Sequence, residues 1–205
     1  MLSYISYKSA KLLESKYKTS NTSYTEIYVY GFTLLFSTLF TATAITLLSL
    51  LYGNIIYGLV FIFFFVPLKL NLGGYHAKTF CGCFLFSVSL FTTIYVLISN
   101  IQIAYIWPIT IILLPCVSIV LFMMKPKVPF NHSVSNELLL KCKKKANYYI
   151  LVDLFIIVFL ITNNDLKRYG FLILLIHFSI MILNLNKLDI RTLGEYLERR
   201  KKHDI

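Results

Sequence analysis

Residues 27–68 read IYVYGFTLLFSTLFTATAITLLSLLYGNIIYGLVFIFFFVPL and contain no Asp, Glu, Lys or Arg. The stretch 79–124 is likewise free of these residues. One membrane crossing takes about 20 apolar residues, so each stretch is long enough for a pair of helices. Each is interrupted near its middle by turn-forming or polar residues, namely Gly53 and Asn54, and Asn100 and Gln102. We therefore expect four helices, near 28–50, 54–68, 80–99 and 103–124.

The composition of the whole chain is also typical of a membrane protein. Of its 205 residues, 58% are hydrophobic and 14% are charged, whereas soluble domains have roughly 45–50% and about 25%. Two further apolar runs, 148–162 and 169–185, follow a basic stretch and are separated by polar and charged residues. They bring the number of expected crossings to six. We therefore expect an all-α integral membrane protein in which residues 1–205 form a single polytopic domain.

The N-terminal segment, residues 1–26, is basic and precedes the first apolar run. It lacks the apolar core and the small-residue cleavage site of a signal peptide, so we expect it to remain in the mature protein. Apolar residues are interspersed among its lysines, which favours an amphipathic helix lying at the membrane interface. These apolar residues are Leu2, Ile5, Leu12 and Leu13.

The lysines and arginines are distributed unevenly along the chain. Cytoplasmic segments of membrane proteins carry an excess of these residues. With six helices and the N-terminus inside, eighteen of the 20 fall in inner segments and only Lys167 and Arg168 fall outside. We therefore expect both termini to be cytoplasmic, together with the loops 69–79 and 125–147 and the tail 186–205. This topology and an anionic inner leaflet explain the net charge of +11, so nucleic-acid binding is not implied.

The loop between the second and third expected helices contains a chemical motif. Residues 73–83 read GGYHAKTFCGC. A cysteine nucleophile needs a base or a positive charge that favours its thiolate, and histidine is the usual base. His76 and Cys83 would lie about 10.5 Å apart along a continuous helix, so a dyad requires a turn that brings His76 back over the helix start. Gly73 and Gly74 permit such a turn.

The start of the following helix also favours a thiolate. Thr79 is a candidate N-cap, and Cys83 would then lie near the positive end of the helix dipole, with Lys78 close by. The reducing cytoplasm would keep Cys81 and Cys83 as free thiols. Helix geometry and charge alone do not decide which of the two cysteines is the nucleophile.

Two other interpretations of this loop are open. Its histidine and cysteines can be purely structural, or His76, Cys81 and Cys83 can bind a metal. Their spacing matches no common zinc pattern, so we expect no metal. The sequence also contains no glycine-rich phosphate loop, dinucleotide fingerprint or HExxH motif, so we expect no cofactor.

The motif resembles the active-site region of the accessory gene regulator B (AgrB) family of bacterial membrane cysteine peptidases. In that family a basic residue precedes a Gly-Gly-x-His-Ala core, and a cysteine follows the histidine by seven positions. Lys69 is the basic residue here, where the family often has Arg, and His76 and Cys83 match the other two positions. Residues 125–145, KPKVPFNHSVSNELLLKCKKK, are similar to a cytoplasmic loop of the family. The resemblance covers most of the chain.

The resemblance implies a cysteine endopeptidase of the bacterial cell membrane with a cytoplasmic active site. Cys83, with His76 as base, would remove the C-terminal tail of a signal propeptide, and the acyl-enzyme thioester would close to a thiolactone or lactone. The supporting residues of the active-site loop would be Lys69, Gly73, Gly74 and Lys78. The implied partners are a short amphipathic propeptide with an acidic tail and the lipid bilayer. A homodimer is a further possibility, since the sequence does not reveal the oligomeric state. The alternative is a non-enzymatic transporter or scaffold with a structural or metal-binding loop.

Other charged residues are candidates for further roles. Asp153 and His177 fall inside expected helices, where ionisable groups are usually functional, and their similar depth allows them to pair. A lysine cluster on the second long cytoplasmic loop is either a solvated, lipid-facing surface or a site for the acidic tail of the propeptide. The cluster consists of Lys141, Lys143, Lys144 and Lys145.

Overall fold

The computed structural model describes residues 2–17, 22–72, 80–126 and 136–203. The regular secondary structure of these residues is entirely α-helical, which confirms the expected all-α class. The helices are α1 (Leu2–Tyr17), α2 (Thr22–Leu51), α3 (Ile55–Leu72), α4 (Phe80–Asn100), α5 (Ile103–Met123), α6 (Asn136–Thr162) and α7 (Lys167–His203).

Six of these helices, α2 to α7, are long and apolar enough to cross a membrane. This confirms the six crossings expected from the two uncharged stretches and the two later apolar runs. The apolar environment explains why each segment is a helix. Hydrocarbon offers no hydrogen-bond partners, so the backbone groups of a crossing segment have to be satisfied within the segment itself.

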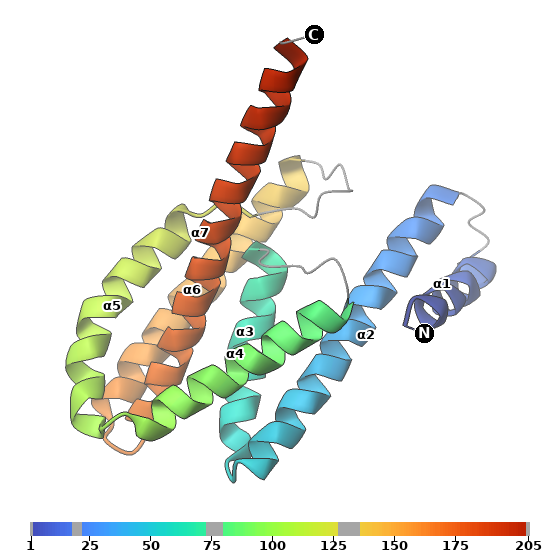
Figure 1. The fold of residues 1–205 in the computed structure, drawn as a ribbon. Coiled ribbons are helices and arrows are strands. Elements are labelled where there is room, and N and C mark those ends of the chain that lie inside the picture. The colour runs from blue at the N-terminus through green and yellow to red at the C-terminus, as the bar shows by residue number, and fades with distance from the viewer. Residues whose placement is uncertain (1, 18–21, 73–79, 127–135, 204–205) are drawn as a thin grey trace.

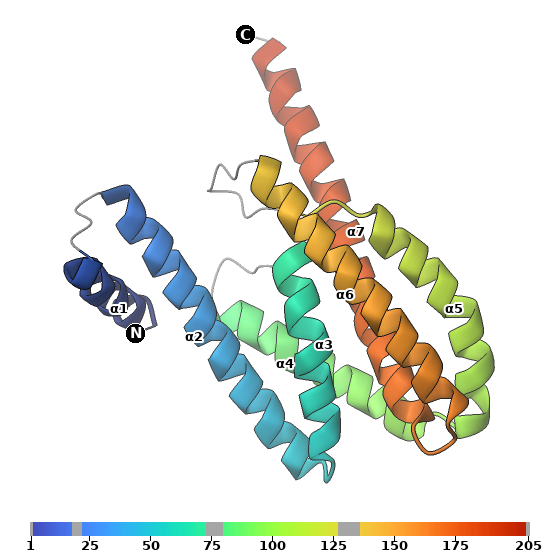
Figure 2. The ribbon, with the colours of Figure 1, turned by 180° about the vertical axis from the view of Figure 1, so that it is seen from behind.

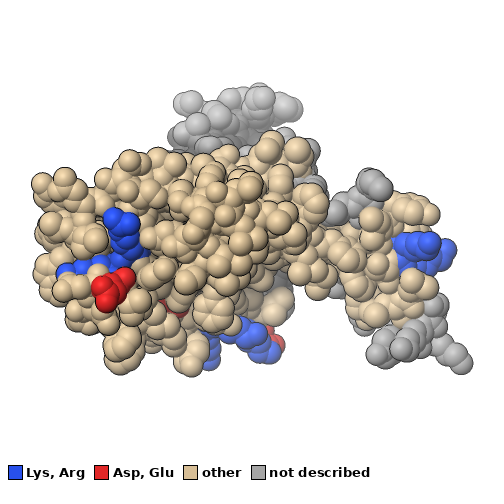
Figure 3. Space-filling view, turned by 90° about the horizontal axis from the view of Figure 1, so that it is seen from below, with Lys and Arg blue, Asp and Glu red and all other residues tan. Residues whose placement is uncertain are grey.

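The spanning helices run back and forth between two ends of the bundle (Figure 1, Figure 2). Short connections join α2 to α3, α4 to α5 and α6 to α7 at one end. At the other end, α3 and α5 finish and α4 and α6 begin. We call it the basic end, because its described residues include Lys69, Lys125, Lys141, Lys143, Lys144 and Lys145. Seen from the opposite end, most of the surface is neither basic nor acidic (Figure 3).

Helix α7 is the centre of the bundle. It packs against α3, α5 and α6. Half of its most apolar window is buried inside the protein, compared with 11% of the corresponding window of α2. The largest fully buried side chains come from several helices and include Phe61, Phe91, Ile150 and Leu172. The core therefore forms around α7, and α2 has a peripheral position.

Helix α1 lies against α2 (Figure 1). Ser6 and Ala10 on α1 are fully buried. The opposite side of the helix is exposed and combines apolar residues such as Leu12 with Lys8 and Lys11. A surface of this kind is typical of interfacial helices, and the location of α1 at a membrane interface stays a prediction.

Four helices extend well beyond the ranges expected from the sequence. α2 begins at Thr22, so the end of the expected N-terminal segment 1–26 belongs to it. α6 begins at Asn136, so the second half of the basic stretch 125–147 is helix rather than loop. α7 continues through the expected tail to His203, and α3 includes Lys69 in its last turn. An apolar run marks only the part of a helix that lipid can surround. Lysine is a good helix former whose long stem carries its charge to water, so the helix continues into the basic segments.

Gly58 lies at a close approach of α2 and α3. A Cβ atom at this position would lie 2.7 Å from the Cβ of Ser49 and would also contact the Ser49 hydroxyl. Both residues are buried. The absence of a side chain at Gly58 therefore allows the two helices to pack together.

We expect Gly58→Ala to lower the stability of the detergent-solubilised protein, because the added methyl group pushes α2 away from α3. Overpacking of this kind costs about 1–3 kcal/mol. Gly31→Ala is the matched control, since Gly31 is exposed on α2 and a Cβ there meets nothing within 4 Å. Thermal unfolding should give a lower midpoint for Gly58→Ala and an unchanged or higher one for Gly31→Ala. Equal midpoints for the two variants would contradict the packing described.

Candidate functional site

Cys83 is the fourth residue of α4 and therefore lies in its first turn. The sequence placed this cysteine near a helix start, and the helix boundary confirms that expectation. Apart from Lys69, the functional residues expected in the active-site loop lie outside the described residues, namely Gly73, Gly74, His76 and Lys78, together with the candidate cap Thr79. The distance between His76 and Cys83 therefore stays a prediction.

Lys69, in the last turn of α3, reaches across to α4. Its Nζ lies 3.4 Å from the Sγ of Cys83, within hydrogen-bonding distance for sulfur. A lysine ammonium has three donors and no acceptor, so Lys69 donates in this contact. A neighbouring positive charge favours the thiolate, which is the nucleophilic form of cysteine. The contact therefore brings together two of the residues that the sequence singled out.

Ser87 lies one helical turn after Cys83 and is 2% exposed. Its Oγ donates a hydrogen bond to the backbone carbonyl of Cys83 at 3.0 Å and accepts one from the Nζ of Lys69 at 3.3 Å. We call Lys69, Cys83 and Ser87 the sulfur site. Sequence reasoning missed Ser87. The only signal for it was its spacing of four residues from Cys83, which places both on one face of a helix.

An aromatic column between α3 and α4 supports the sulfur site. The ring of Phe65 lies 5.2 Å from the Nζ of Lys69, a distance typical of a cation–π contact. Phe65 stacks on Phe61 with 4.9 Å between centroids, and Phe61 meets Phe91 of α4 at 5.3 Å. Such pairs each contribute about 0.5–1.5 kcal/mol beyond the burial of their surface. The column therefore holds the two helices that supply the lysine and the thiol.

Cys81 and Cys83 are both free thiols, but their surroundings differ. Cys81 is exposed, whereas Cys83 is partly buried and has the ammonium of Lys69 beside it. In the part of the chain that the structure describes, no group of three or more His, Cys, Asp or Glu residues is placed to hold a metal ion. The geometry therefore distinguishes Cys83 from Cys81, which the sequence alone did not.

The four clustered lysines of α6 also have different surroundings. Lys141 pairs with Glu137, one turn earlier, at 2.6 Å. Lys143 donates to two backbone carbonyls at the end of α5, those of Leu121 at 3.2 Å and Phe122 at 2.7 Å. It therefore satisfies the carbonyl of Phe122 and adds a second hydrogen bond to that of Leu121, which also accepts from the backbone N–H of Met124 at 3.3 Å. The remaining two members of the cluster are exposed, Lys144 and Lys145.

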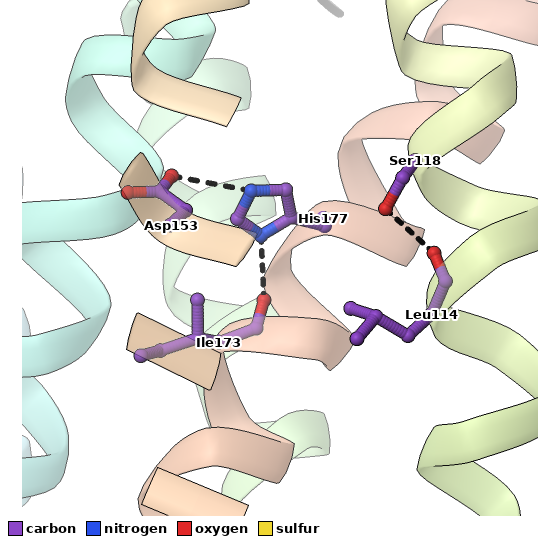
Figure 4. A network of polar contacts seen from close by, with 5 residues as sticks. All are labelled: Leu114, Ser118, Asp153, Ile173 and His177. Atoms are coloured by element: carbon purple, nitrogen blue, oxygen red, sulfur yellow. Dashed lines mark hydrogen bonds and ion pairs between the residues drawn. The ribbon is translucent and has the colours of Figure 1, made fainter. Parts of the chain in front are cut away.

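A second polar group lies in the interior of the bundle (Figure 4). Asp153 of α6 and His177 of α7 are 6% and 3% exposed, and the Oδ2 of Asp153 lies 3.2 Å from the Nε2 of His177. The pair anticipated from the sequence is thus confirmed. α6 begins earlier than the apolar run, so Asp153 is farther from the helix start than expected. Asp153 lies nine residues from the end of α6 at Thr162, or about 14 Å along the helix axis.

The two ring nitrogens of His177 have different surroundings. The Nδ1 of His177 lies 2.8 Å from the backbone carbonyl of Ile173, and since a carbonyl can only accept, Nδ1 carries a proton. The Nε2 of a neutral ring would then be an acceptor. It forms no hydrogen bond with the described residues, and its polar neighbour is the carboxyl group of Asp153 at 3.2 Å. The two side chains therefore meet at the distance of an ion pair.

The comparison with protein families identifies the chain. A family model described as accessory gene regulator B matches residues 6–185, which include the sulfur site and the pair of Asp153 and His177. The chain belongs to the AgrB family. AgrB membership implies the processing of autoinducing peptides for quorum sensing, and the family is one of propeptide-processing peptidases in the membrane. No curated protein and no solved structure matches the chain significantly.

The contact between Asp153 and His177 yields a prediction. Asp153→Ala removes the carboxyl group beside the buried Nε2 of His177, and we expect a loss of about 1–3 kcal/mol in the free energy of unfolding. Asp153→Asn should retain most of the stability, because its amide group keeps the shape of the side chain and can donate to a neutral Nε2. Thermal unfolding in detergent measures both variants. An Asn variant as unstable as the Ala variant would contradict a stabilising contact between these two positions.

Proposed function

We propose that this AgrB-family chain is a cysteine endopeptidase in which Cys83 is the nucleophile and His76 the general base. Its substrate is a short AgrD-type propeptide with an amphipathic leader and an acidic C-terminal tail. The observation that carries the proposal is the contact between the Nζ of Lys69 and the Sγ of Cys83 at 3.4 Å. This contact gives one of the two cysteines in the motif a positively charged neighbour.

In the first step, His76 takes the proton of the Cys83 thiol, and the sulfur attacks the carbonyl carbon of the scissile peptide bond. A bond between sulfur and carbon forms, and the bond between carbon and nitrogen breaks. The proton passes from His76 to the departing amine, so the tail leaves as a peptide with a free amino terminus. The remaining part of the propeptide is held as a thioester on Cys83.

In the second step, a Cys or Ser side chain of the bound propeptide attacks this thioester. Its sulfur or oxygen bonds to the carbonyl carbon, and the thiol of Cys83 is released with the proton of the attacking group. The product is a thiolactone or a lactone ring. Water would hydrolyse the same thioester, so the site has to exclude it. The burial of Ser87 and Phe65, at 2% and 3% exposed, supports a water-poor environment beneath the sulfur.

The proposed orientation puts the basic end of the bundle in the cytoplasm. This end contains six of the described lysines, and cytoplasmic segments are the ones in which Lys and Arg accumulate. The cytoplasm is reducing, so Cys83 and Cys81 stay as thiols there. Both chain termini lie on the same side in this topology. A homodimer stays a prediction.

The nucleophile is tested by expressing an AgrD-type propeptide together with variants of this chain. Cys83→Ala should reduce release of the tail below detection, and His76→Ala should reduce it severely, because each removes a group that takes part in bond cleavage. Cys81→Ala is the matched control, since Cys81 lies two residues away on the same helix and is exposed. Mass spectrometry of the released tail gives the result. Cleavage by Cys83→Ala would exclude the proposed mechanism.

We also propose that lysines of the cluster on α6 receive the acidic tail. Lys144 and Lys145 are the stronger candidates, because both are exposed, whereas Lys143 contacts the end of α5 and Lys141 pairs with Glu137. Two exposed positive charges raise the local concentration of an acidic peptide.

The double variant Lys144→Glu/Lys145→Glu should therefore process the propeptide several-fold more slowly at low substrate concentration, with normal insertion in the membrane. Lys167→Glu, at the opposite end of the bundle, is the control for a change of charge. The rate of tail release over a series of salt concentrations measures the effect, and the deficit should shrink as salt increases. Equal rates for the double variant and the wild type would exclude this site for the tail.

A further inference from the structure

We propose that Ser87 is a positioning residue that holds the ammonium group of Lys69 beside the thiol of Cys83. This inference rests on the proposed role of Cys83 as nucleophile. Ser87 forms its hydrogen bonds with Lys69 and with the backbone carbonyl of Cys83 rather than with the sulfur. At 2% exposed, it is too deeply buried to reach a substrate. Its effect on the reaction would therefore pass through Lys69.

The hydroxyl group of Ser87 can only accept from Lys69. A hydroxyl has one hydrogen, and that of Ser87 is donated to the backbone carbonyl of Cys83 at 3.0 Å. The lone pairs that remain are available to the Nζ of Lys69 at 3.3 Å. This carbonyl belongs to the same residue as the thiol, so one short chain of hydrogen bonds links the ammonium, the hydroxyl and the nucleophile residue.

Lys69 needs such an anchor because its own side chain is long and flexible. A lysine side chain has four rotatable bonds, and holding it in one conformation costs conformational entropy. Lys69 is only partly buried and lies at a helix end, where water and anionic groups compete for an ammonium. The described contacts of the ammonium are the ring of Phe65, the sulfur of Cys83 and the hydroxyl of Ser87, and Ser87 supplies the one oxygen among them.

The positions of the groups around the ammonium make Ser87 the residue that selects the conformation of the Lys69 side chain. The ring of Phe65 lies one helical turn before Lys69 and supports the ammonium from α3 itself. Ser87 lies across the interface on α4 and directs the ammonium toward the face of α4 that carries Cys83. Without the hydroxyl, the ammonium can keep its contact with Phe65 while leaving the sulfur. Loss of Ser87 should therefore weaken the contact between the ammonium and the thiol of Cys83 without removing the positive charge from the protein.

Alkylation of Cys83 by iodoacetamide in the intact, detergent-solubilised protein tests this inference without any substrate. Only the thiolate reacts, so the rate at pH 7 reports its population. The parent protein for the test is Cys81→Ser, so that mass spectrometry of the peptide containing Cys83 reads one thiol. We expect Ser87→Ala to lower the rate about threefold to tenfold at pH 7, because the ammonium of Lys69 is then no longer held beside the sulfur. The difference should disappear near pH 10, where a free cysteine is almost fully ionised.

Matched substitutions separate the hydroxyl from the shape of the side chain. Ser87→Thr keeps the hydroxyl and should stay within about twofold of the parent, whereas Ser87→Val has the shape of Thr without the hydroxyl and should behave like Ser87→Ala. Ser89→Ala is the control on the same helix, since Ser89 is exposed, and it should leave the rate unchanged. The pair of Thr and Val variants also decides the question where Ser87→Ala alone unfolds.

A double-mutant cycle with Lys69→Met shows whether Ser87 acts through the lysine. Lys69→Met removes the charge, so adding Ser87→Ala to it should lower the alkylation rate no further. An equal further loss in the Lys69→Met background would mean that Ser87 has a merely structural role, and no loss from Ser87→Ala alone would mean that it has no role. Either result overturns the inference. Both leave the proposed function intact as long as Cys83→Ala abolishes cleavage, and cleavage by Cys83→Ala overturns the proposed function instead.

Discussion

The need to satisfy every backbone group inside the membrane determines where this protein can carry out chemistry. Hydrocarbon provides no hydrogen-bond partners, so each crossing is a complete helix. Backbone groups and polar side chains become available to a substrate at the ends of the helices. The sulfur site lies at such a position, with Lys69 in the last turn of α3 and Cys83 in the first turn of α4. The two helices are consecutive in the sequence, and the aromatic column holds them together.

The pair of Asp153 and His177 and the sulfur site differ in how their polar side chains are accommodated. Asp153 and His177 are deep in the interior and lie 3.2 Å apart. Lys69 is at the edge, where its charge is placed over an aromatic ring and beside a thiol. Deeply buried charges are costly unless paired. A residue that must contact a substrate is therefore better placed at the basic end. We infer that the pair of Asp153 and His177 holds α6 against α7, whereas the sulfur site serves the reaction.

Much of the fold could be predicted from the sequence, because the rules that fix it are local. The uncharged stretches predicted the crossings, and Gly53 and Asn54 predicted a turn. Gly53 has a positive φ, of 79°, as such a turn allows. The start of α6 was missed, since a basic segment looks like a loop whether or not it is helical. The pairing of Asp153 and His177 followed from helix depth. No local pattern reveals how helices rotate against each other. The contact of Lys69 with Cys83 depends on this rotation, and so do the roles of Ser87 and Phe65 and the position of Lys143.

The central claim is that the acyl group of the propeptide is carried on Cys83. Its most direct test is mass spectrometry of the protein rapidly quenched in acid during the reaction with a propeptide whose ring-closing Cys or Ser is replaced by Ala, which slows release of the acyl group. We predict an adduct on the peptide that contains Cys83, with the mass of the propeptide lacking its tail, that neutral hydroxylamine removes because it cleaves thioesters. Accumulation of cleaved tail with the adduct on Cys81, or with no adduct on either cysteine, would contradict the claim.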